Sequence, residues 1–246
     1  MLLEGKSAII TGAGSGIGQA SAQLFTDYGA QVLAVDVPGK GLHDTHAAND
    51  AVTTLEKDIT DDDAPETIVQ AAIDKFGKLD ILFNNAGVSG RENAEFMDEA
   101  HWDHVMAVNV TAQFRLAKAA IPELRACGAG RIINTAYVMA EGTDFGLAAY
   151  CASKAGVAGL TRTLALELGR DNITANYLEP GAVYTGMTRA GFDDEEIAKV
   201  WARKSALKRL GEPIDLAKGA VFLASDLAAF VTGHGLRVDG GLMLRV

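Results

Sequence analysis

The sequence is poor in proline, in cysteine and in basic residues. Five prolines in 246 residues leave few rigid breaks, whereas 27 glycines permit many tight turns. Two cysteines give no disulfide framework and suit a reducing compartment. The 22 basic residues are outnumbered by 32 acidic ones, and the net charge of −10 argues against a nucleic-acid partner, whose phosphates most of the surface would repel.

Long apolar runs are also missing. No run approaches the roughly 18 residues that would span a bilayer, and residues 1–6 are too short for a signal peptide before the first apolar run. The sequence therefore predicts a cytoplasmic protein without a membrane partner. Hydrophobic residues make up 48% of the chain and charged residues 22%, a balance that can bury a sizeable core.

Short apolar runs alternate with longer amphipathic segments along the chain. We expect buried strands at 7–11, 31–35, 52–56, 79–84, 130–136, 173–179 and 235–239. We expect helices at 16–28, 62–76, 98–126, 148–169 and 212–224. This alternation predicts an α/β fold, a doubly wound parallel sheet of about seven strands with helices on both faces. Ligands of such sheets bind beyond the carboxyl ends of the strands.

No repeat, low-complexity tract or linker divides the chain, so residues 1–246 are expected to form a single domain. Residues 184–204 interrupt the alternation with two glycines, an acidic run and an amphipathic segment. A flexible segment with a short helix at this place could be a lid over a pocket, or only a solvated surface helix.

A glycine-rich turn, "TGAGSGIG" at 11–18, joins the first expected strand to the first expected helix. Gly12, Gly16 and Gly18 would allow a tight turn, close approach of a pyrophosphate, and packing of the helix on the sheet. The amides of the helix N-terminus would then face the phosphates. The pattern is not the G-x-G-x-x-G fingerprint, because position 17 is isoleucine rather than glycine, and it reads instead T-G-x-x-x-G-x-G. Its place between strand and helix favours nucleotide binding over a purely structural turn.

An acidic residue, Asp36, ends the second expected strand. A carboxylate at this position can accept both hydroxyls of an adenosine ribose and would repel a 2′-phosphate. Neither Ser15 nor Val37 supplies a cation for such a phosphate. The pattern therefore predicts NAD(H) rather than NADP(H). Asp58, after the third expected strand, is placed to contact the adenine edge.

Several motifs in order resemble those of the short-chain dehydrogenase/reductase family along nearly the whole chain. Besides the glycine-rich turn they are "NNAG" at 84–87, Asn109 within "VNV", Y-x-x-x-K at 150–154, "PGAVYT" at 180–185, "RLGEP" at 209–213 and "VDGG" at 238–241. The resemblance implies a nicotinamide-dependent alcohol–carbonyl oxidoreductase, usually a homotetramer, with a small-molecule substrate.

The resemblance also implies which residues bind each ligand. The implied cofactor-binding residues are Gly12, Ser15, Gly16, Ile17, Gly18, Asp36, Val37, Asp58, Ile59, Asn85, Ala86, Gly87, Tyr150, Lys154, Pro180, Gly181, Val183 and Thr185. The expected substrate walls are Val88, Tyr137, Val138, Phe145, Tyr184 and Met187. These walls are mostly apolar or aromatic and favour a hydrophobic or cyclic alcohol or ketone. We expect no metal, because His101 and His104 have no third ligand nearby in a metal-site pattern.

The expected catalytic pair is Tyr150 and Lys154, one helical turn apart on one face. A carbonyl that is being reduced needs a proton, and a free tyrosine with a pKa of about 10 holds its proton too tightly near neutrality. A nearby ammonium should lower that pKa. The resemblance further implies that Lys154 holds the nicotinamide ribose and that Asn109 orders a water in a proton relay.

The largest departure from the family pattern is at position 137. The family has a serine there, thirteen residues before the tyrosine, that hydrogen-bonds the substrate oxygen, whereas this chain has Tyr137 preceded by Ala136. Three interpretations compete. Tyr137 could donate its own hydroxyl in a reshaped pocket, Thr135 could substitute from a deeper position on the same strand face, or the site could be impaired. Losing one such donor costs ~10²–10³ in rate, which slows an enzyme without abolishing the chemistry.

The sequence therefore predicts an active NAD(H)-dependent oxidoreductase that interconverts a secondary alcohol and a ketone, with Tyr150 as general acid/base and an altered donor at position 137. Two alternatives stay open. One is a 3-oxoacyl thioester reductase, against which Asp36 argues because such biosynthetic reductases usually favour NADP(H). The other is a catalytically impaired NAD-binding protein that acts as a sensor or scaffold.

Overall fold

A seven-stranded parallel sheet forms the centre of the computed structural model, which describes residues 1–244 apart from the side chain of Met139. The strands are β1 (Ser7–Thr11), β2 (Gln31–Asp36), β3 (Val52–Glu56), β4 (Ile81–Asn84), β5 (Arg131–Thr135), β6 (Thr174–Pro180) and β7 (Gly235–Val238). They pair in the order β3-β2-β1-β4-β5-β6-β7. The predicted α/β fold with a doubly wound sheet is confirmed. The order reverses between β1 and β4, which places a ligand crevice at the carboxyl end of β1.

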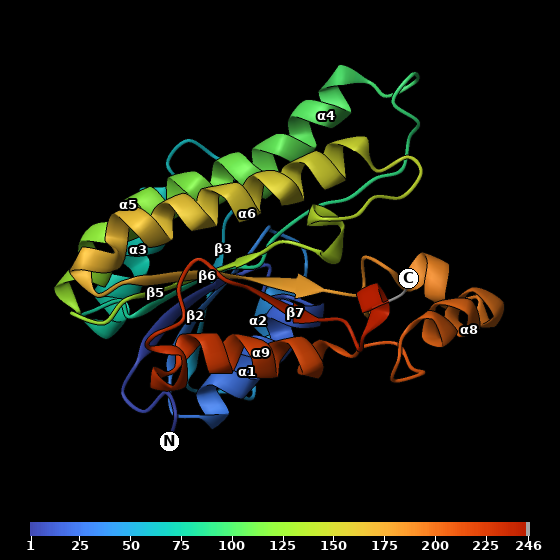
Figure 1. Ribbon diagram of the computed structural model, residues 1–246. Helices are drawn as coiled ribbons and strands as arrows, with labels where there is room; N and C mark the ends of the chain where they lie inside the picture. Colours follow the sequence, from blue (N-terminus) through green and yellow to red (C-terminus); the bar gives the residue numbers. More distant parts are fainter. Residues whose placement is uncertain (245–246) are drawn as a thin grey trace.

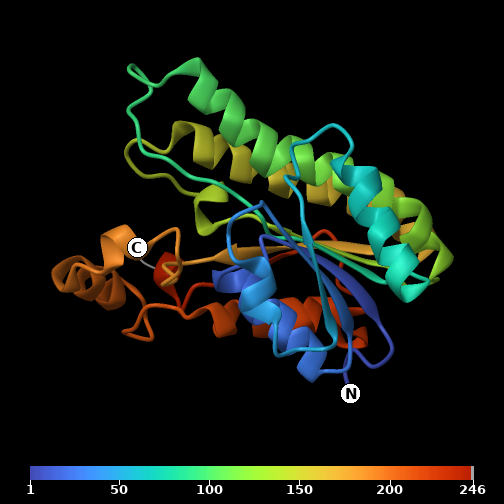
Figure 2. The same cartoon turned by 180° about the vertical axis from the view of Figure 1, so that it is seen from behind.

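Helices cover both faces of this sheet (Figure 1). One layer contains α3 (Ala64–Phe76), α5 (Ala112–Ala126) and α6 (Ala148–Leu168), and α3 lies beside α5 in the view from behind (Figure 2). The other layer contains α1 (Gly16–Asp27), α9 (Pro213–Ala224) and the short α2 (Leu42–His46), a helix that the sequence reasoning missed.

Alternation along the strands builds a separate hydrophobic core under each layer. Ile9 and Ile10 are consecutive in β1 and both fully buried, yet Ile9 packs with Ile68 of α3 and Ile10 packs with Phe25 of α1. Successive side chains of a strand point to opposite faces, so a strand covered on both sides must be apolar throughout. This requirement explains why the central strands β1, β2 and β4 read as largely apolar runs, whereas the edge strands β3 and β7 are only partly buried.

The helix expected over 98–126 is confirmed at residues 99–126. It consists of α4 (Glu99–Met106), one π-helical turn (Ala107–Thr111) and α5, which follow one another without a break. The π-helical turn was not foreseen. The widened turn contains Asn109, whose fully buried side chain is bonded to the backbone of Val88 on the loop after β4. Single π-turns of this kind are frequent at functional sites.

Residues between β6 and α9 form two helices beyond the carboxyl edge of the sheet, α7 (Arg189–Phe192) and α8 (Glu195–Lys204) (Figure 1). Asp194 caps α8 by accepting hydrogen bonds from the amides of Glu196 and Ile197. The remaining short helices are 3-10 turns at Val138–Ala140, Gly169–Asp171, Asp226–Ala228 and Leu242–Leu244. Within residues 1–244, no helix combines the length and the apolar character needed to cross a membrane.

Candidate active site

A cleft of about 710 Å³ lies at the carboxyl ends of the central strands. It extends from Asp36 at the end of β2, past the glycine-rich turn, to Tyr150 and Lys154 on α6. The structure brings to this cleft every residue that the sequence reasoning gave to the cofactor except Gly18. Gly18 instead packs against the turn itself, where an added Cβ would lie 2.1 Å from the carbonyl oxygen of Gly12.

Backbone conformation explains the other glycines of the turn. Gly12 and Gly16 have φ values of +66° and +55°, which disfavour any residue with a Cβ. The turn leads into α1, whose N-cap Ser15 makes no side-chain capping hydrogen bond. Amides of a first helical turn without a cap can bind an anionic group, and here Ser15, Gly16 and Ile17 line the cleft. The turn therefore fits a pyrophosphate.

Asp36 is fixed at the far end of the cleft. Its Oδ2 accepts a hydrogen bond from the Gly14 amide at 2.8 Å, and its Oδ1 accepts one from the Val37 amide at 2.8 Å. Asp58, also on the cleft wall, accepts hydrogen bonds from the hydroxyl and the amide of Thr60. These bonds hold the pKa of Asp58 below its ordinary value. Both carboxylates are thus oriented before any ligand binds.

Lys154 is the most deeply buried charged group of the cleft. Its Nζ donates to the carbonyl oxygen of Thr135 at 2.7 Å and lies 5.6 Å from the centre of the Tyr150 ring. Burial lowers the pKa of Lys154 to about 8. Burial also raises the pKa of Tyr150 above its ordinary value, with smaller contributions from Tyr137 and Cys151. The expectation that the ammonium would lower the pKa of Tyr150 is therefore wrong for this structure, because desolvation of the phenolate outweighs the charge.

Behind this pair, Asn109 connects α6 to the loop after β4. Its Oδ1 accepts from the Val88 amide at 2.8 Å, and its Nδ2 donates to Val88 oxygen and to Ser153 Oγ, each at 2.9 Å. Ser153 in turn donates to the Tyr150 carbonyl oxygen at 2.7 Å. Asn109 does not line the cleft. Ser153 was missed by the sequence reasoning, although its place three residues after Tyr150 on a helix was a usable signal.

Tyr137 does enter the cleft, beside Tyr150. The two rings are 5.5 Å apart between centroids, at 66° to each other. Burial raises the pKa of Tyr137, so its hydroxyl keeps its proton near neutrality. Thr135 lies deeper, as expected from strand alternation, and its buried Oγ1 has no hydrogen-bond partner within residues 1–244.

Comparison with known proteins agrees with this geometry. The family model described as enoyl-(acyl carrier protein) reductase matches residues 12–243. The 3-oxoacyl-[acyl-carrier-protein] reductase FabG of Vibrio cholerae is 37% identical over 99% of this chain and 100% of its own length. An uncharacterized short-chain type dehydrogenase/reductase of Sinorhizobium fredii is 36% identical over 99% of this chain and 100% of its own length. The chain belongs to the short-chain dehydrogenase/reductase family.

Solved structures and other relatives show how broad this family is. Levodione reductase has a TM-score of 0.94 and 33% identity, covering 99% of this chain and 100% of its own. A protein of Beutenbergia cavernae assigned as an NAD(P)-dependent gluconate 5-dehydrogenase, with NADP bound at low occupancy, has a TM-score of 0.92 and 34% identity, covering 99% and 98%. Secoisolariciresinol dehydrogenase of Forsythia intermedia is 38% identical over 97% of this chain and 89% of its own. This short-chain dehydrogenase/reductase is thus an oxidoreductase of alcohol or ketone groups with an NAD(P) cofactor.

The substrate walls expected for this short-chain dehydrogenase/reductase are only partly found in the cleft. Val88, Tyr137 and Met187 line it. Val138 does not, because it is fully buried in the layer beneath. Phe145 is 88% exposed and points to solvent. Tyr184 lines a neighbouring groove of about 780 Å³ between α8 and residues 209–214. Side-chain direction at these positions depends on tertiary packing that the apolar pattern does not encode.

Other lining residues were not foreseen. They are Lys40, Lys57, His104, Val108, Gly186 and Thr188. Lys40 was detectable, since it follows the strand that ends at Asp36. Lys57 is held by Asp61 and Asp63 at 2.9 and 2.8 Å, which directs its ammonium toward those carboxylates. Thr188 donates to the Val183 carbonyl oxygen at 2.6 Å and so folds residues 183–188 back against the cleft.

Proposed function

We propose that this short-chain dehydrogenase/reductase interconverts a secondary alcohol and a ketone with NAD(H), and that its substrate is apolar or cyclic. The observation that carries the proposal is a single cleft with Asp36 at one end and the Tyr150–Lys154 pair at the other. The distance between these ends is spanned by a glycine-rich turn suited to a pyrophosphate.

The residues present fit a dinucleotide. Asp36 would accept the adenosine ribose hydroxyls, the start of α1 would bind the pyrophosphate, and Thr185 would hold the carboxamide. Glycine suits position 87 beside the nicotinamide end of the cleft, because there is little room for a side chain. An added Cβ would lie 3.2 Å from Asn109 Oδ1 and 3.4 Å from Lys154 Nζ. When bound, the nicotinamide supplies or accepts the hydride.

Within this arrangement Tyr150 is proposed as the general acid/base. Burial keeps its phenol protonated near neutrality, so the proton for a ketone oxygen is present, but the raised pKa also makes the phenol a weaker acid. Lys154, fixed by Thr135 oxygen, would anchor the ribose and favour the phenolate when the proton leaves. Asn109 is fully buried outside the cleft, and its side-chain amide is bonded to Val88 and Ser153. It would therefore support the proton relay by fixing the positions of these two residues.

Tyr137 is proposed as the donor that replaces the family serine. Two buried phenols at one wall can present two O–H groups to one carbonyl oxygen, and the raised pKa of Tyr137 keeps its proton in place. A ring at this position also narrows the cleft and favours flat or cyclic substrates. Met187, followed by α7 and α8, would close the open side as a lid. The homotetramer, the single domain and the cytoplasmic location stay predictions.

A 3-oxoacyl thioester is the second candidate substrate, because FabG proteins match this chain over its full length. Asp36 argues against it. A carboxylate hydrogen-bonded at the ribose end would repel the 2′-phosphate of the NADPH that biosynthetic reductases usually favour.

The test is NADH and NADPH oxidation with a panel of cyclic and aryl ketones and with acetoacetyl thioesters. We expect turnover of ketones with NADH, and turnover at least ~10²-fold slower in a Tyr150→Phe control that still binds NADH. Faster turnover of thioesters with NADPH would replace the proposal by the second candidate. Stoichiometric NADH binding without turnover of any carbonyl would identify a non-catalytic binding protein.

A further inference from the structure

Three charged residues connect the last two strands of the sheet to the segment that carries Tyr137. Glu179 of β6 and Arg237 of β7 are register partners in adjacent strands. Arg237 Nε donates to Glu179 Oε2 at 3.2 Å. A second nitrogen of the same guanidinium, Nη2, donates to Glu141 Oε2 at 2.5 Å. One arginine therefore bridges two carboxylates from different parts of the chain.

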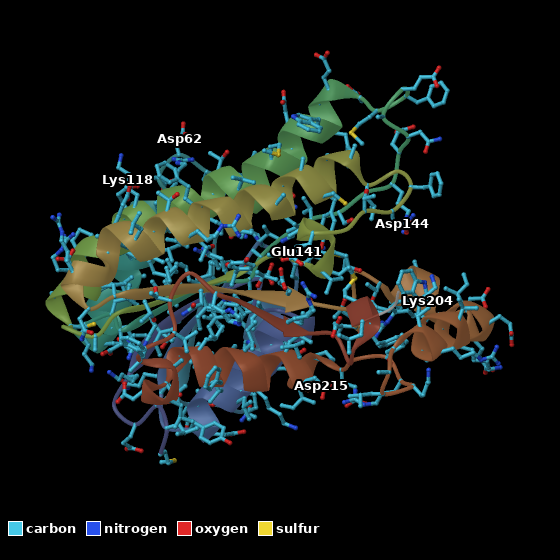
Figure 3. The ribbon with its side chains drawn as sticks, viewed as in Figure 1. Asp62, Lys118, Glu141, Asp144, Lys204 and Asp215 are labelled. Atoms are coloured by element: carbon cyan, nitrogen blue, oxygen red, sulfur yellow. The ribbon has the colours of Figure 1, made fainter. Side chains whose placement is uncertain are left out.

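Glu141 belongs to the loop between β5 and α6. It follows the 3-10 turn Val138–Ala140, and its amide donates to the Val138 carbonyl oxygen at 3.3 Å. Tyr137 is the residue immediately before that turn. Figure 3 shows Glu141 near the carboxyl ends of β6 and β7, where the loop passes over the sheet edge. The contact with Arg237 therefore holds the segment that begins with Tyr137.

The far end of the same loop is held separately. Asp144 pairs with Arg91 at 2.6 Å, and the amide of Glu92 donates to Gly146 oxygen at 2.9 Å. In Figure 3 Asp144 lies farther out than Glu141, toward the tip of the loop. Arg91 is thus an anchor to the loop after β4. Arg237 is the anchor to the sheet itself, and the loop residue that it holds, Glu141, is nearer in sequence to Tyr137 than Asp144 is.

Burial distinguishes this bridge from an ordinary surface ion pair. Glu179 is 2% exposed, and its Oε1 has no hydrogen-bond partner in the part of the chain that is described. A carboxylate buried in this way requires a cation, so Arg237 is held in one place. Exposed pairs gain little because both long side chains must be ordered. Here the arginine is already ordered, and only Glu141 must be.

The guanidinium is also the chemistry that this bridge needs. Arginine presents several N–H donors in a rigid planar fork, and can bind two carboxylates in fixed directions. A lysine ammonium is a point charge on a flexible stem, and would fix neither direction to the same degree. Because Arg237 belongs to strand β7, its hydrogen bond to Glu141 fixes the loop relative to that strand.

We propose that Arg237 is a positioning residue: buried Glu179 fixes its guanidinium, the guanidinium holds Glu141, and the loop thereby keeps Tyr137 against Tyr150. This rests on the proposed function, because the position of Tyr137 affects a rate only if the cleft reduces a carbonyl. Arg237 would touch neither substrate nor cofactor. Its effect would pass through Tyr137 alone.

The first experiment compares Glu141→Gln with a matched control, Asp226→Asn. Asp226 is likewise an exposed partner of a strand arginine, Arg131, at 3.2 Å. Arg131 is the first residue of β5, so this pair lies at the amino-terminal ends of the strands, away from the cleft. For Glu141→Gln we expect kcat/KM for the ketone to fall roughly tenfold, since small misplacements of reacting groups are costly. The Kd for NADH should change less than about twofold, because no residue of the glycine-rich turn is altered. Asp226→Asn should leave both values unchanged, and equal losses of kcat/KM in both variants would overturn the proposal.

A second comparison tests whether the effect passes through Tyr137. In a Tyr137→Ser background, Glu141→Gln should lose most of its tenfold effect, because the ring to be positioned is gone. Two changes that act independently would instead multiply. Arg237→Lys should give an intermediate loss, with the charge kept and the fork removed. A full tenfold effect of Glu141→Gln without the Tyr137 ring would overturn the proposed route.

Hydrogen exchange separates failure of this inference from failure of the proposed function. Amides of residues 137–147 should exchange faster in Glu141→Gln than in the unmodified protein or in Asp226→Asn, whether or not any ketone is turned over. If the unmodified protein turned over no ketone but the difference in exchange were found, the proposed function would be wrong and the role of Arg237 in holding the loop would still be supported. Unchanged amide exchange in Glu141→Gln would show that the contact between Arg237 and Glu141 does not hold the loop, whatever the activity.

Discussion

The ring of Tyr137 meets the ring of Tyr150 edge to face, with centroids 5.5 Å apart and planes at 66°. Contacts of this geometry are favourable between aromatic rings, and each contributes about 0.5–1.5 kcal/mol beyond area burial. The pair also places a second phenol next to the proposed general acid. Tyr137 raises the pKa of Tyr150 only as a secondary effect, since burial is the largest cause.

Tyr137→Phe tests whether the second phenol donates a hydrogen bond. The substitution keeps the ring contact and removes only the hydroxyl, so we expect kcat for a ketone to fall roughly 10²-fold with little change in KM. Tyr137→Ser restores a shorter donor and opens space, and should accept bulkier ketones. Steady-state kinetics on small and bulky ketones measure both effects. An unchanged kcat in Tyr137→Phe would assign the ring a purely steric role.

Tyr150→Phe tests the general acid. Removing a positioned acid or base costs about 10²–10⁴ in rate, so kcat for ketone reduction should fall by at least ~10²-fold. The Kd for NADH, measured by fluorescence titration, should stay within about twofold, because binding depends mainly on the other end of the cleft. Turnover that survives in Tyr150→Phe would mean that another group supplies the proton.

Asp36→Asn tests the choice between NADH and NADPH. Asparagine keeps the size of the side chain and can still accept from the Gly14 amide, now at 2.8 Å from Asp36 Oδ2. It removes the charge that would bind ribose hydroxyls and repel a 2′-phosphate. We expect the ratio of kcat/KM for NADH to that for NADPH to fall roughly tenfold or more, since hydrogen bonds to a charged group contribute about 1.5–3 kcal/mol. An equal NADH-to-NADPH ratio in the variant and in the unmodified protein would show that Asp36 only holds the glycine-rich turn through the Gly14 amide.

Lys154→Met tests the cost of a buried ammonium. Burial lowers the pKa of Lys154 from 10.5 to about 8, equivalent to about 3 kcal/mol against the charged form. Losing its hydrogen bond to Thr135 oxygen costs about 1 kcal/mol. We therefore expect the variant to have a free energy of unfolding about 1–3 kcal/mol higher at pH 7, although it should lose activity.

The pH dependence of that difference has a definite sign. Between pH 8 and 10.5 the unfolded protein holds the Lys154 proton and the folded protein does not, so the unmodified protein gains stability as the pH rises through this window. The advantage of Lys154→Met should be largest below pH 8 and shrink toward pH 10.5. Urea unfolding of both proteins at pH 7, 9 and 10 measures it. A difference that is constant with pH would show that Lys154 is not desolvated as the structure implies.

Much of the fold, most of the cofactor end of the site and half of the expected substrate walls follow from local patterns. Runs of strand length marked all seven strands to within two residues, most clearly the central ones, because a strand covered on both faces must be largely apolar. Asp36 and the pair Tyr150 and Lys154 were also recognised in place, since each depends on spacing within one element. Side chains on loops were harder: Val138 and Phe145 were expected in the cleft, but neither lines it.

The sequence by itself determined the element types, the glycines of the turn, and the tyrosine–lysine spacing, all of which depend on residues close together in the chain. Only the tertiary structure decided the strand order, the π-turn at Asn109, and the bridge from Arg237 to Glu141, residues 96 positions apart. The physical reason is range. Backbone propensity and periodicity act over a few residues, whereas buried polar groups take partners from wherever packing places them.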